Sequence, residues 1–251
     1  MTALMPDIPP SPAPSLSRRL WAAGLQPRYP SFENRVVVAG WEEGPKGMAL
    51  IRARSVSHQG QRRAVTPFFL DRSPVTNAQY RDYLLATGAP PPHHWTGWRA
   101  PRGYELHPVV GITLDDARAY AAWRKARLPT ELEWVSAVRG PSGERRFPWG
   151  EMCDGLRCHC PLLGHSEAGP VKTHPSGSSP EGVEDLYGNV WEWTEASEGL
   201  SPAVQGMSRV LGGSFAHRCT AWTGVPTTEV RANKGHAYVG FRCAADVPQQ
   251  G

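Results

Sequence analysis

The sequence has no long apolar run and no dense block of charge of one sign. No window approaches the roughly 20 apolar residues that a membrane-spanning helix needs. The net charge is +4, with both signs mixed along the 251 residues, and no basic run is dense enough to indicate nucleic acid or a membrane surface as a partner. Pro6, Pro9 and Pro10 stand where a signal peptide needs an apolar stretch. We therefore expect a cytoplasmic protein with neither kind of partner.

Cysteine is also scarce. There are five, Cys153, Cys158, Cys160, Cys219 and Cys243. An odd number in a chain expected to be cytoplasmic does not favour a disulfide framework. Three of the thiols and His159 fall within residues 153–160, and thiolates with an imidazole suit zinc. Because the cluster has no C-x-x-C spacing, a local redox pair or simple free thiols remain open as alternatives.

Tryptophan, glycine and proline are abundant instead. Ten Trp, 26 Gly and 25 Pro indicate many turns, pinned by large aromatic side chains rather than by long helices. The length allows one large domain or two small ones. We expect a disordered proline-rich tail over 1–17, a folded domain over 18–246 and a short C-terminal tail over 247–251.

Three helices are predicted by one local pattern. A threonine is followed three places later by an acidic or amide residue at Thr76–Gln79, Thr113–Asp116 and Thr130–Glu133. The threonine oxygen can accept a free N–H of the first turn, and the later side chain can reach back. The expected helices span 77–86, 114–125 and 131–139, and Gly88 and Gly140 follow two of them as stop signals. Helical spacing directs a set of apolar residues inward, namely Tyr80, Tyr83, Leu84, Ala117, Tyr120, Ala121, Trp123 and Trp134.

Short apolar runs predict strands at 36–39, 48–51, 66–70, 209–212 and 236–242. Residues 90–108 and 161–182 are rich in Gly, Pro or Ser and are typical of loops. The first loop holds His93, His94, His107, Trp95 and Trp98. These side chains either form the wall of a pocket or belong to a surface connection whose tryptophans pack inward; the second interpretation is favoured.

The segment 185–193, DLYGNVWEW, is the most distinctive stretch. Asp185 and Glu192 lie among large aromatic residues, and a buried carboxylate is costly unless it is paired, hydrogen-bonded or bound to metal. One interpretation is a calcium site in which both carboxylates combine with the carbonyls of Gly188 and Val190. The alternative is a core strand whose acids meet arginines or backbone N–H groups.

This segment resembles the signature of the formylglycine-generating enzyme, or sulfatase-modifying factor, superfamily. Further matches follow in the order of that family, over roughly residues 47–246: SPVTNAQY at 73–80, HPVV at 107–110, ARAYAAW at 117–123, RLPTELEW at 127–134, PWG at 148–150, LGGSF at 211–215 and GFRCAAD at 240–246. The resemblance implies an α+β, C-type-lectin-like fold with little regular secondary structure, short strands and two or three helices. Such folds carry several functions, so the resemblance specifies the fold more closely than the activity.

The resemblance also implies site residues. Asp185, Gly188, Val190 and Glu192 match the positions that hold a calcium ion in the oxidases of the family. Those oxidases use copper bound to two cysteines after the Gly-Gly-Ser motif, because thiolates select Cu(I). In this chain His217 stands in place of the first cysteine, and Cys219 is the only thiol of the region. The resemblance therefore implies that the two-thiolate copper site is absent.

Two functions follow as hypotheses. The first is a binding module for a protein or small-molecule ligand, whose contact surface lies in 214–238, with Ser214, His217, Arg218, Trp222, Arg231, Asn233, His236 and Tyr238 as candidates. The second is a metal-dependent oxidoreductase in which copper or iron binds a rebuilt catalytic pair, His217 and Cys219, with His236 or His107 in reach. An enzyme needs these side chains to converge on one point, whereas a binding module lets them face solvent.

Overall fold

The computed structural model describes residues 37–38, 41–42, 44–198, 200–201, 203–218 and 224–248. They belong to one compact unit, Asn34–Gly251. The expected tail over 1–17, together with Cys219 and Trp222, lies outside the described residues. Within that part of the chain, no helix has the length and apolar character needed to span a bilayer.

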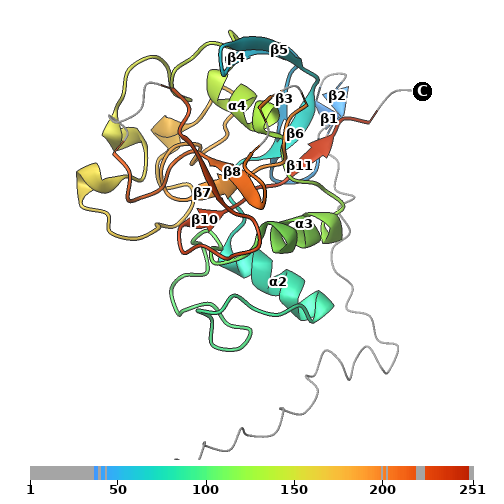
Figure 1. Cartoon of the computed structure of the whole chain (residues 1–251), viewed down its shortest axis with the longest axis vertical. Coiled ribbons are helices and arrows are strands. Elements are labelled where there is room, and N and C mark those ends of the chain that lie inside the picture. The colour runs from blue at the N-terminus through green and yellow to red at the C-terminus, as the bar shows by residue number, and fades with distance from the viewer. Residues whose placement is uncertain are drawn as a thin grey trace, which may run out of the picture. The chain divides into compact units, whose positions relative to one another are not determined.

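A three-stranded antiparallel sheet separates two hydrophobic cores. It consists of β3 (Met48–Ile51), β6 (Phe68–Asp71) and β11 (Ala244–Asp246), in the order β11-β6-β3 (Figure 1). Because successive strand residues point to opposite faces, Phe69 packs into the first core, whereas Phe68 and Leu70 pack into the second. All four residues of β6 are buried, as expected for a strand covered on both faces.

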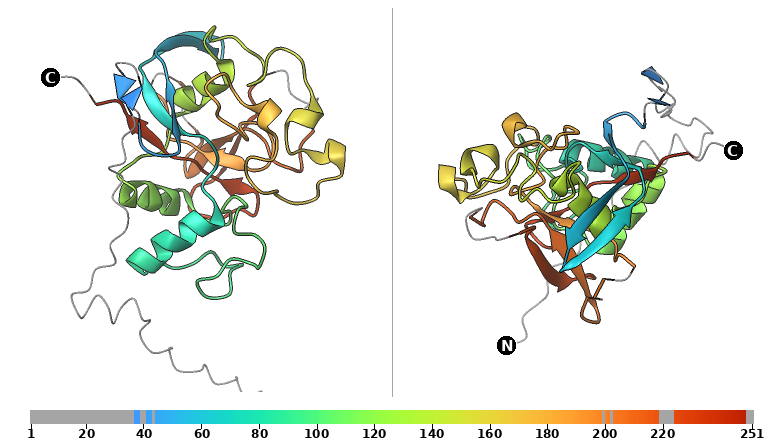
Figure 2. Two further views of the ribbon diagram at one scale, coloured as in Figure 1. Left: turned by 180° about the vertical axis from the view of Figure 1, so that it is seen from behind. Right: turned by 90° about the horizontal axis from the view of Figure 1, so that it is seen from above.

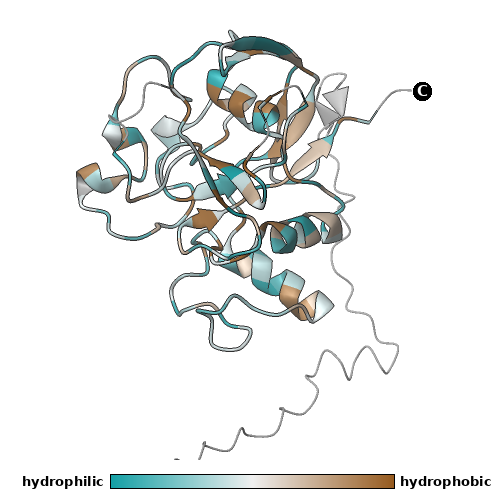
Figure 3. Ribbon diagram, viewed as in Figure 1, coloured by the Kyte–Doolittle hydropathy of each residue, from teal (hydrophilic) through white to brown (hydrophobic). Residues whose placement is uncertain are grey.

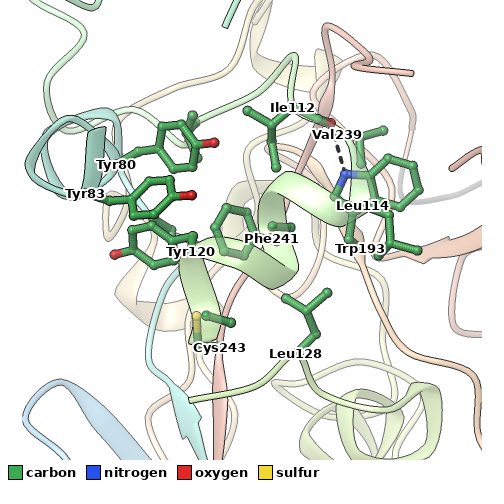
Figure 4. Packing of buried hydrophobic residues seen from close by; sticks show 14 of the residues in the cluster. Tyr80, Tyr83, Ile112, Leu114, Tyr120, Leu128, Trp193, Val239, Phe241 and Cys243 are labelled. Atoms are coloured by element: carbon green, nitrogen blue, oxygen red, sulfur yellow. Dashed lines mark hydrogen bonds between the residues drawn. The ribbon is translucent and has the colours of Figure 1, made fainter. Parts of the chain in front are cut away.

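The first core lies against α2 (Asn77–Thr87) and α3 (Leu114–Trp123). Its centre is a group of aromatic rings in which Tyr120 lies 5.6 Å from Tyr80, 5.5 Å from Tyr83 and 5.2 Å from Phe241, measured between ring centroids (Figure 4). The ring of Trp95 makes an edge-to-face contact with the ring of Tyr80. Aromatic rings at these separations stabilise a core beyond the area that they bury.

The second core lies against α4 (Glu131–Arg139) and the hairpin of β4 (Arg54–His58) and β5 (Gln61–Val65). Trp134 of α4 is fully buried there. Each of the three helices contains both hydrophobic and hydrophilic residues (Figure 3). α2 and α3 bury four residues each, whereas α4 buries eight of its nine residues.

A mixed four-stranded sheet carries the tryptophan segment. Its strands are β7 (Trp191–Trp193), β8 (Met207–Leu211), β9 (Thr227–Arg231) and β10 (Val239–Gly240), in the order β10-β7-β8-β9. β10 runs parallel to β7, and the other pairs are antiparallel. A two-stranded ribbon of β1 (Val37–Val38) and β2 (Trp41–Glu42) is also present.

The segment 155–182 has little regular structure. It contains only short 3-10 turns, η1 (Gly155–Arg157), η2 (Pro161–Leu163) and η3 (Pro175–Gly177). In two opposite views this segment lies on the side of the unit away from β3 and β6 (Figures 1 and 2).

The structure confirms the α+β class with short strands, and the three helices at their expected first residues. Each expected capping box is formed, and Gly88 adopts the left-handed conformation after α2. α3 ends two residues earlier than expected, and Lys125 has a left-handed φ of 56°. The strand expected over 236–242 is reduced to Val239–Gly240, because a turn precedes it in which the carbonyl of His236 accepts the backbone N–H groups of Val239 at 3.2 Å and Gly111 at 2.9 Å.

Candidate functional site

The three side chains of β7 point to two opposite faces of the sheet. Residues two apart on a strand share a face, so Trp191 and Trp193 lie together, and both belong to the first core. The indole N–H of Trp193 donates to the carbonyl of Ile112 at 3.3 Å (Figure 4). Glu192 points to the opposite face, where it meets Trp134 of α4.

Glu192 forms a fully buried ion pair with Arg242. Oε1 accepts a hydrogen bond from Nη2 of Arg242 at 2.6 Å, and Oε2 accepts one from Nε at 2.7 Å. Oε2 also accepts the indole N–H of Trp134 at 2.7 Å. Neither charged side chain is exposed. The burial of this carboxylate is therefore compensated by the protein itself.

Asp185 is the second carboxylate of the segment. It has a left-handed φ of 56°, and its Oδ2 accepts the backbone N–H of Lys172 at 3.0 Å. Burial raises the pKa of Asp185 to about 6, and the Lys172 N–H and the charge of Arg242 oppose this rise. The carboxylate is thus less well compensated than that of Glu192.

These two environments bear on the expected calcium site at Asp185, Gly188, Val190 and Glu192. A calcium ion that binds Glu192 has to share the Glu192 carboxylate with the guanidinium of Arg242. The calcium ion and the guanidinium are both positively charged and repel each other. Asp185 is the better donor of the two. The geometry favours the ion-pair interpretation for Glu192, and calcium binding stays a prediction.

His217 follows the turn at Gly212 and Gly213. Its Nδ1 lies 2.9 Å from Oγ of Ser214, and its ring meets the edge of Trp191 at 5.2 Å between centroids. Burial lowers the pKa of His217, which favours the neutral ring. Ser214 is fully buried, so it orients the half-buried His217 instead of facing solvent as a contact residue.

His236 approaches the second tryptophan of the same face. Its ring lies 5.9 Å from Trp193, and its Nε2 lies 3.1 Å from the carbonyl oxygen of Arg231. His217 and His236 are therefore arranged along one face of β7. In the described part of the chain they do not form a group of three close ligand atoms with His107, and Cys219 lies outside the described residues.

The outer side chains of the expected binding face point to solvent. Arg218, Arg231 and Asn233 are exposed, and Tyr238 retains 44% of its accessible surface. Trp222 lies outside the described residues. The described contact candidates are thus spread over the surface, apart from the buried Ser214.

The remaining candidate residues are the cysteines and the histidines and tryptophans of 90–108. Cys158 and Cys160 are buried in the second core and Cys243 is buried in the first, and these three cysteines and Cys153 form no disulfide among the described residues. His93 and His94 are exposed while Trp95 is buried, which agrees with the favoured interpretation of 90–108 as a connection. A group formed by His159, His165 and His174 was not predicted; one ring nitrogen from each lies within 4.8 Å of the other two. Its only signal in the sequence was the density of histidine over 159–174.

Comparisons with known proteins agree with this architecture. Residues 30–247 match the family model described as FGE-sulfatase, sulfatase-modifying factor enzyme 1-like domain. The chain is 31% identical to a formylglycine-generating enzyme of Thermomonospora curvata, over 72% of this chain and 83% of the relative. It is 32% identical to the mouse protein named inactive C-alpha-formylglycine-generating enzyme 2, over 74% and 78%.

A solved structure of CarF superposes with a TM-score of 0.63, at 19% identity, over 80% of this chain and 98% of CarF. At that identity the superposition supports the fold alone. The family match covers most of the chain, and the strand order, capping boxes and tryptophan segment form one structure. The chain therefore belongs to the FGE-sulfatase family, as a sulfatase-modifying factor enzyme 1-like domain.

Proposed function

We propose that this chain is a binding or accessory member of its family, and that residues 214–238 form its contact surface. The observation that carries the proposal is the outward orientation of the candidate side chains, with Arg218, Arg231 and Tyr238 exposed. Tyrosine and arginine dominate the energetics of many interfaces. The buried Ser214 supports this surface through its hydrogen bond to the half-buried His217.

The charge of this surface indicates the kind of partner. Its described part contains three cationic residues, Arg218, Arg231 and Lys234. Its one described acid, Glu229, lies 3.5 Å from the guanidinium of Arg209. We infer that the partner presents an acidic surface, because complementary charge speeds encounter and favours the matching partner.

Two further points support a role without copper oxidation. His217 stands where the resemblance places the first copper cysteine, and a neutral imidazole does not replace the Cu(I) preference of a thiolate pair. A mouse relative of similar identity bears the name of an inactive enzyme.

The test uses two labelled peptides, poly-glutamate and poly-lysine, with affinity measured by fluorescence anisotropy. We expect the full chain to bind the acidic peptide only. We expect Arg231→Ala with Lys234→Ala to weaken binding by about 2- to 30-fold, since exposed ion pairs contribute about 0.2–1 kcal/mol each. Arg62→Ala with Lys46→Ala removes the same two charge types from exposed positions elsewhere and is expected to bind normally. Equal binding of both peptides, or equal weakening by the two double variants, would contradict the proposal.

A metal-dependent oxidoreductase is the second candidate, supported by the placement of His217 and His236 along one tryptophan face. Incubation with a cysteine-containing sulfatase peptide and copper(I) or iron(II) under oxygen tests it by peptide mass spectrometry. Conversion of the peptide cysteine that is lost in His217→Ala would make this candidate the leading function. We expect no conversion.

A further inference from the structure

His159, His165 and His174 come together outside the surface described above. One ring nitrogen from each lies within 4.8 Å of the other two, and this is the one such group of three ligand residues among the described residues. His159 is buried, and His165 and His174 are partly buried. The rings of His159 and His165 are stacked with centroids 3.7 Å apart.

Hydrogen bonds already orient two of the rings. Nε2 of His159 lies 2.9 Å from the carbonyl oxygen of Glu167, which requires an N–H at Nε2 and leaves Nδ1 as a lone-pair donor. Nδ1 of His174 lies 3.0 Å from Oγ1 of Thr173. The other ring nitrogen, Nε2, is therefore the atom that can bind a metal ion. A carbonyl that fixes the tautomer in this way is typical of histidines that bind metal.

The third ring has an unsatisfied nitrogen. Nε2 of His165 is buried and has no hydrogen-bond partner in the described part of the structure. A buried polar atom without a partner destabilises the folded state. A metal ion bound to this ring would remove that penalty.

Two of the three rings, those of His159 and His174, favour the neutral form that binds metal. Burial lowers the pKa of His159 and His174, and the neighbouring imidazoles lower it further. Neutral imidazoles are metal ligands.

We propose that His159, His165 and His174 bind one first-row transition-metal ion of the zinc class. Imidazole nitrogen suits zinc, copper, iron and nickel, whereas calcium takes oxygen ligands. The nearby thiols are not part of this group: Cys160 is buried, and its sulfur lies 3.7 Å from the carbonyl oxygen of Gly155.

Binding requires a small rearrangement. A metal lies in the plane of each ring that binds it, so the stacked rings of His159 and His165 have to tilt apart to share one ion at about 2.0–2.1 Å. His159 is fixed by Glu167 and by close packing against Gly169. His165 lies between the exposed residues Gly164 and Ser166, so it is the ring that moves.

The position of the group gives the ion a structural role. The carbonyl of His159 accepts the backbone N–H of Asn189, two residues before β7, at 2.8 Å. His165 and His174 lie further along the same irregular segment, 155–182. An ion held by all three ties this segment to the base of β7. Binding to the folded chain alone raises its stability.

The experiment starts from the full chain, stripped with a chelator and dialysed under reducing conditions. Zinc is then titrated against a chromophoric competitor, stoichiometry is measured by mass spectrometry of the metal, and cobalt(II) replaces zinc to report the ligand field. We expect one equivalent of zinc and a rise in Tm. His165→Ala and His174→Ala, at partly buried positions, are expected to weaken binding by more than about 100-fold, since losing an outer-shell partner alone weakens it about 10- to 100-fold.

Three controls make the result specific. His93→Ala removes an exposed histidine elsewhere, and Cys153→Ser removes the partly buried thiol; both are expected to keep the site. Gly169→Ala places a methyl group 2.4 Å from the ring of His159 and is expected to weaken binding with all three histidines intact. No zinc equivalent, or an equivalent that survives His165→Ala and His174→Ala, would overturn the proposal, and loss in Cys153→Ser alone would assign the metal to the thiols.

Discussion

Arg242 is an arginine with no exposed surface, and its guanidinium is hydrogen-bonded to other residues of the protein. Besides Glu192, it donates to the carbonyls of Asp71 at 3.0 Å and Glu184 at 2.9 Å. Removing charges from water is unfavourable, and the ion pair offsets this only while both partners and their hydrogen bonds are present. Single substitutions at this pair are therefore expected to be severe.

We expect Glu192→Ala to lower the free energy of unfolding by about 3–5 kcal/mol, because it leaves the Arg242 charge buried without its partner. Added calcium is not expected to restore the loss. Urea and thermal unfolding with and without calcium measure both effects. An unchanged Tm would remove the structural role assigned to Glu192.

The matched control replaces both charges, as Glu192→Leu with Arg242→Met. Replacing both members of a buried ion pair by apolar residues is often close to neutral, so the double variant should be more stable than Glu192→Ala. A double variant that is less stable than either single substitution would argue that the other hydrogen bonds of Arg242 dominate.

At the scale of single elements, the helices are defined by their first turns. Oγ1 of Thr113 accepts the backbone N–H of Asp116 at 3.1 Å, and Asp116 Oδ2 accepts the N–H of Thr113 at 2.9 Å. We expect Thr113→Ala to lower the free energy of unfolding by about 1 kcal/mol, and Thr113→Ser by much less, because serine keeps the cap. Chemical denaturation of both variants checks this, and equal losses would assign the effect to packing of the methyl group.

α4, β4 and β8 are joined by a buried charge cluster. Glu131 accepts from Arg209 at 3.0 Å and lies 2.6 Å from Nε2 of His58. Burial alone would raise the pKa of Glu131, but its hydrogen bonds to His58 and Arg209 outweigh burial and lower it. The cluster thus favours the charged form of the carboxylate in the folded state.

The sign of the pH dependence follows from that shift. Because the pKa of Glu131 is lower in the folded chain, its contribution is complete above the unfolded pKa of about 4.3 and is lost as pH falls through the folded pKa. We expect unfolding free energy to fall below about pH 4.3, and to fall less steeply in Glu131→Gln. Denaturant titrations across pH 2–7 compare the slopes, and identical slopes would contradict this assignment.

The sequence predicts the elements that local chemistry determines. The three threonine caps located the helices, and the resemblance gave the fold. The β4–β5 hairpin was missed because Arg54, Arg62 and Arg63 interrupt the apolar pattern. β10 is short because a turn at residues 237–238 precedes it. The histidine group depends on how an irregular segment folds back, and no periodicity describes that.

At the scale of the whole molecule, calcium binding is the prediction from the family resemblance that is still to be measured. We expect any calcium-dependent rise in Tm of the chelator-treated chain to disappear in Asp185→Ala, because Asp185 is the better available oxygen donor, and to persist in the exposed control Glu105→Ala. Differential scanning calorimetry with calcium or magnesium measures this. No rise in the native chain would leave Asp185, Gly188, Val190 and Glu192 without a metal role.

The central sheet has a consequence for unfolding. Because β6 gives Phe69 to one core and Phe68 and Leu70 to the other, neither core is closed without this strand. If α2 and α3 separate from the sheet, β6 loses its packing in the first core, and the second core under α4 is weakened because it uses the same strand. Separation of α4 weakens the first core in the same way. The chain is therefore expected to melt in one cooperative step, with the amide hydrogens of β6 exchanging only when the whole unit opens.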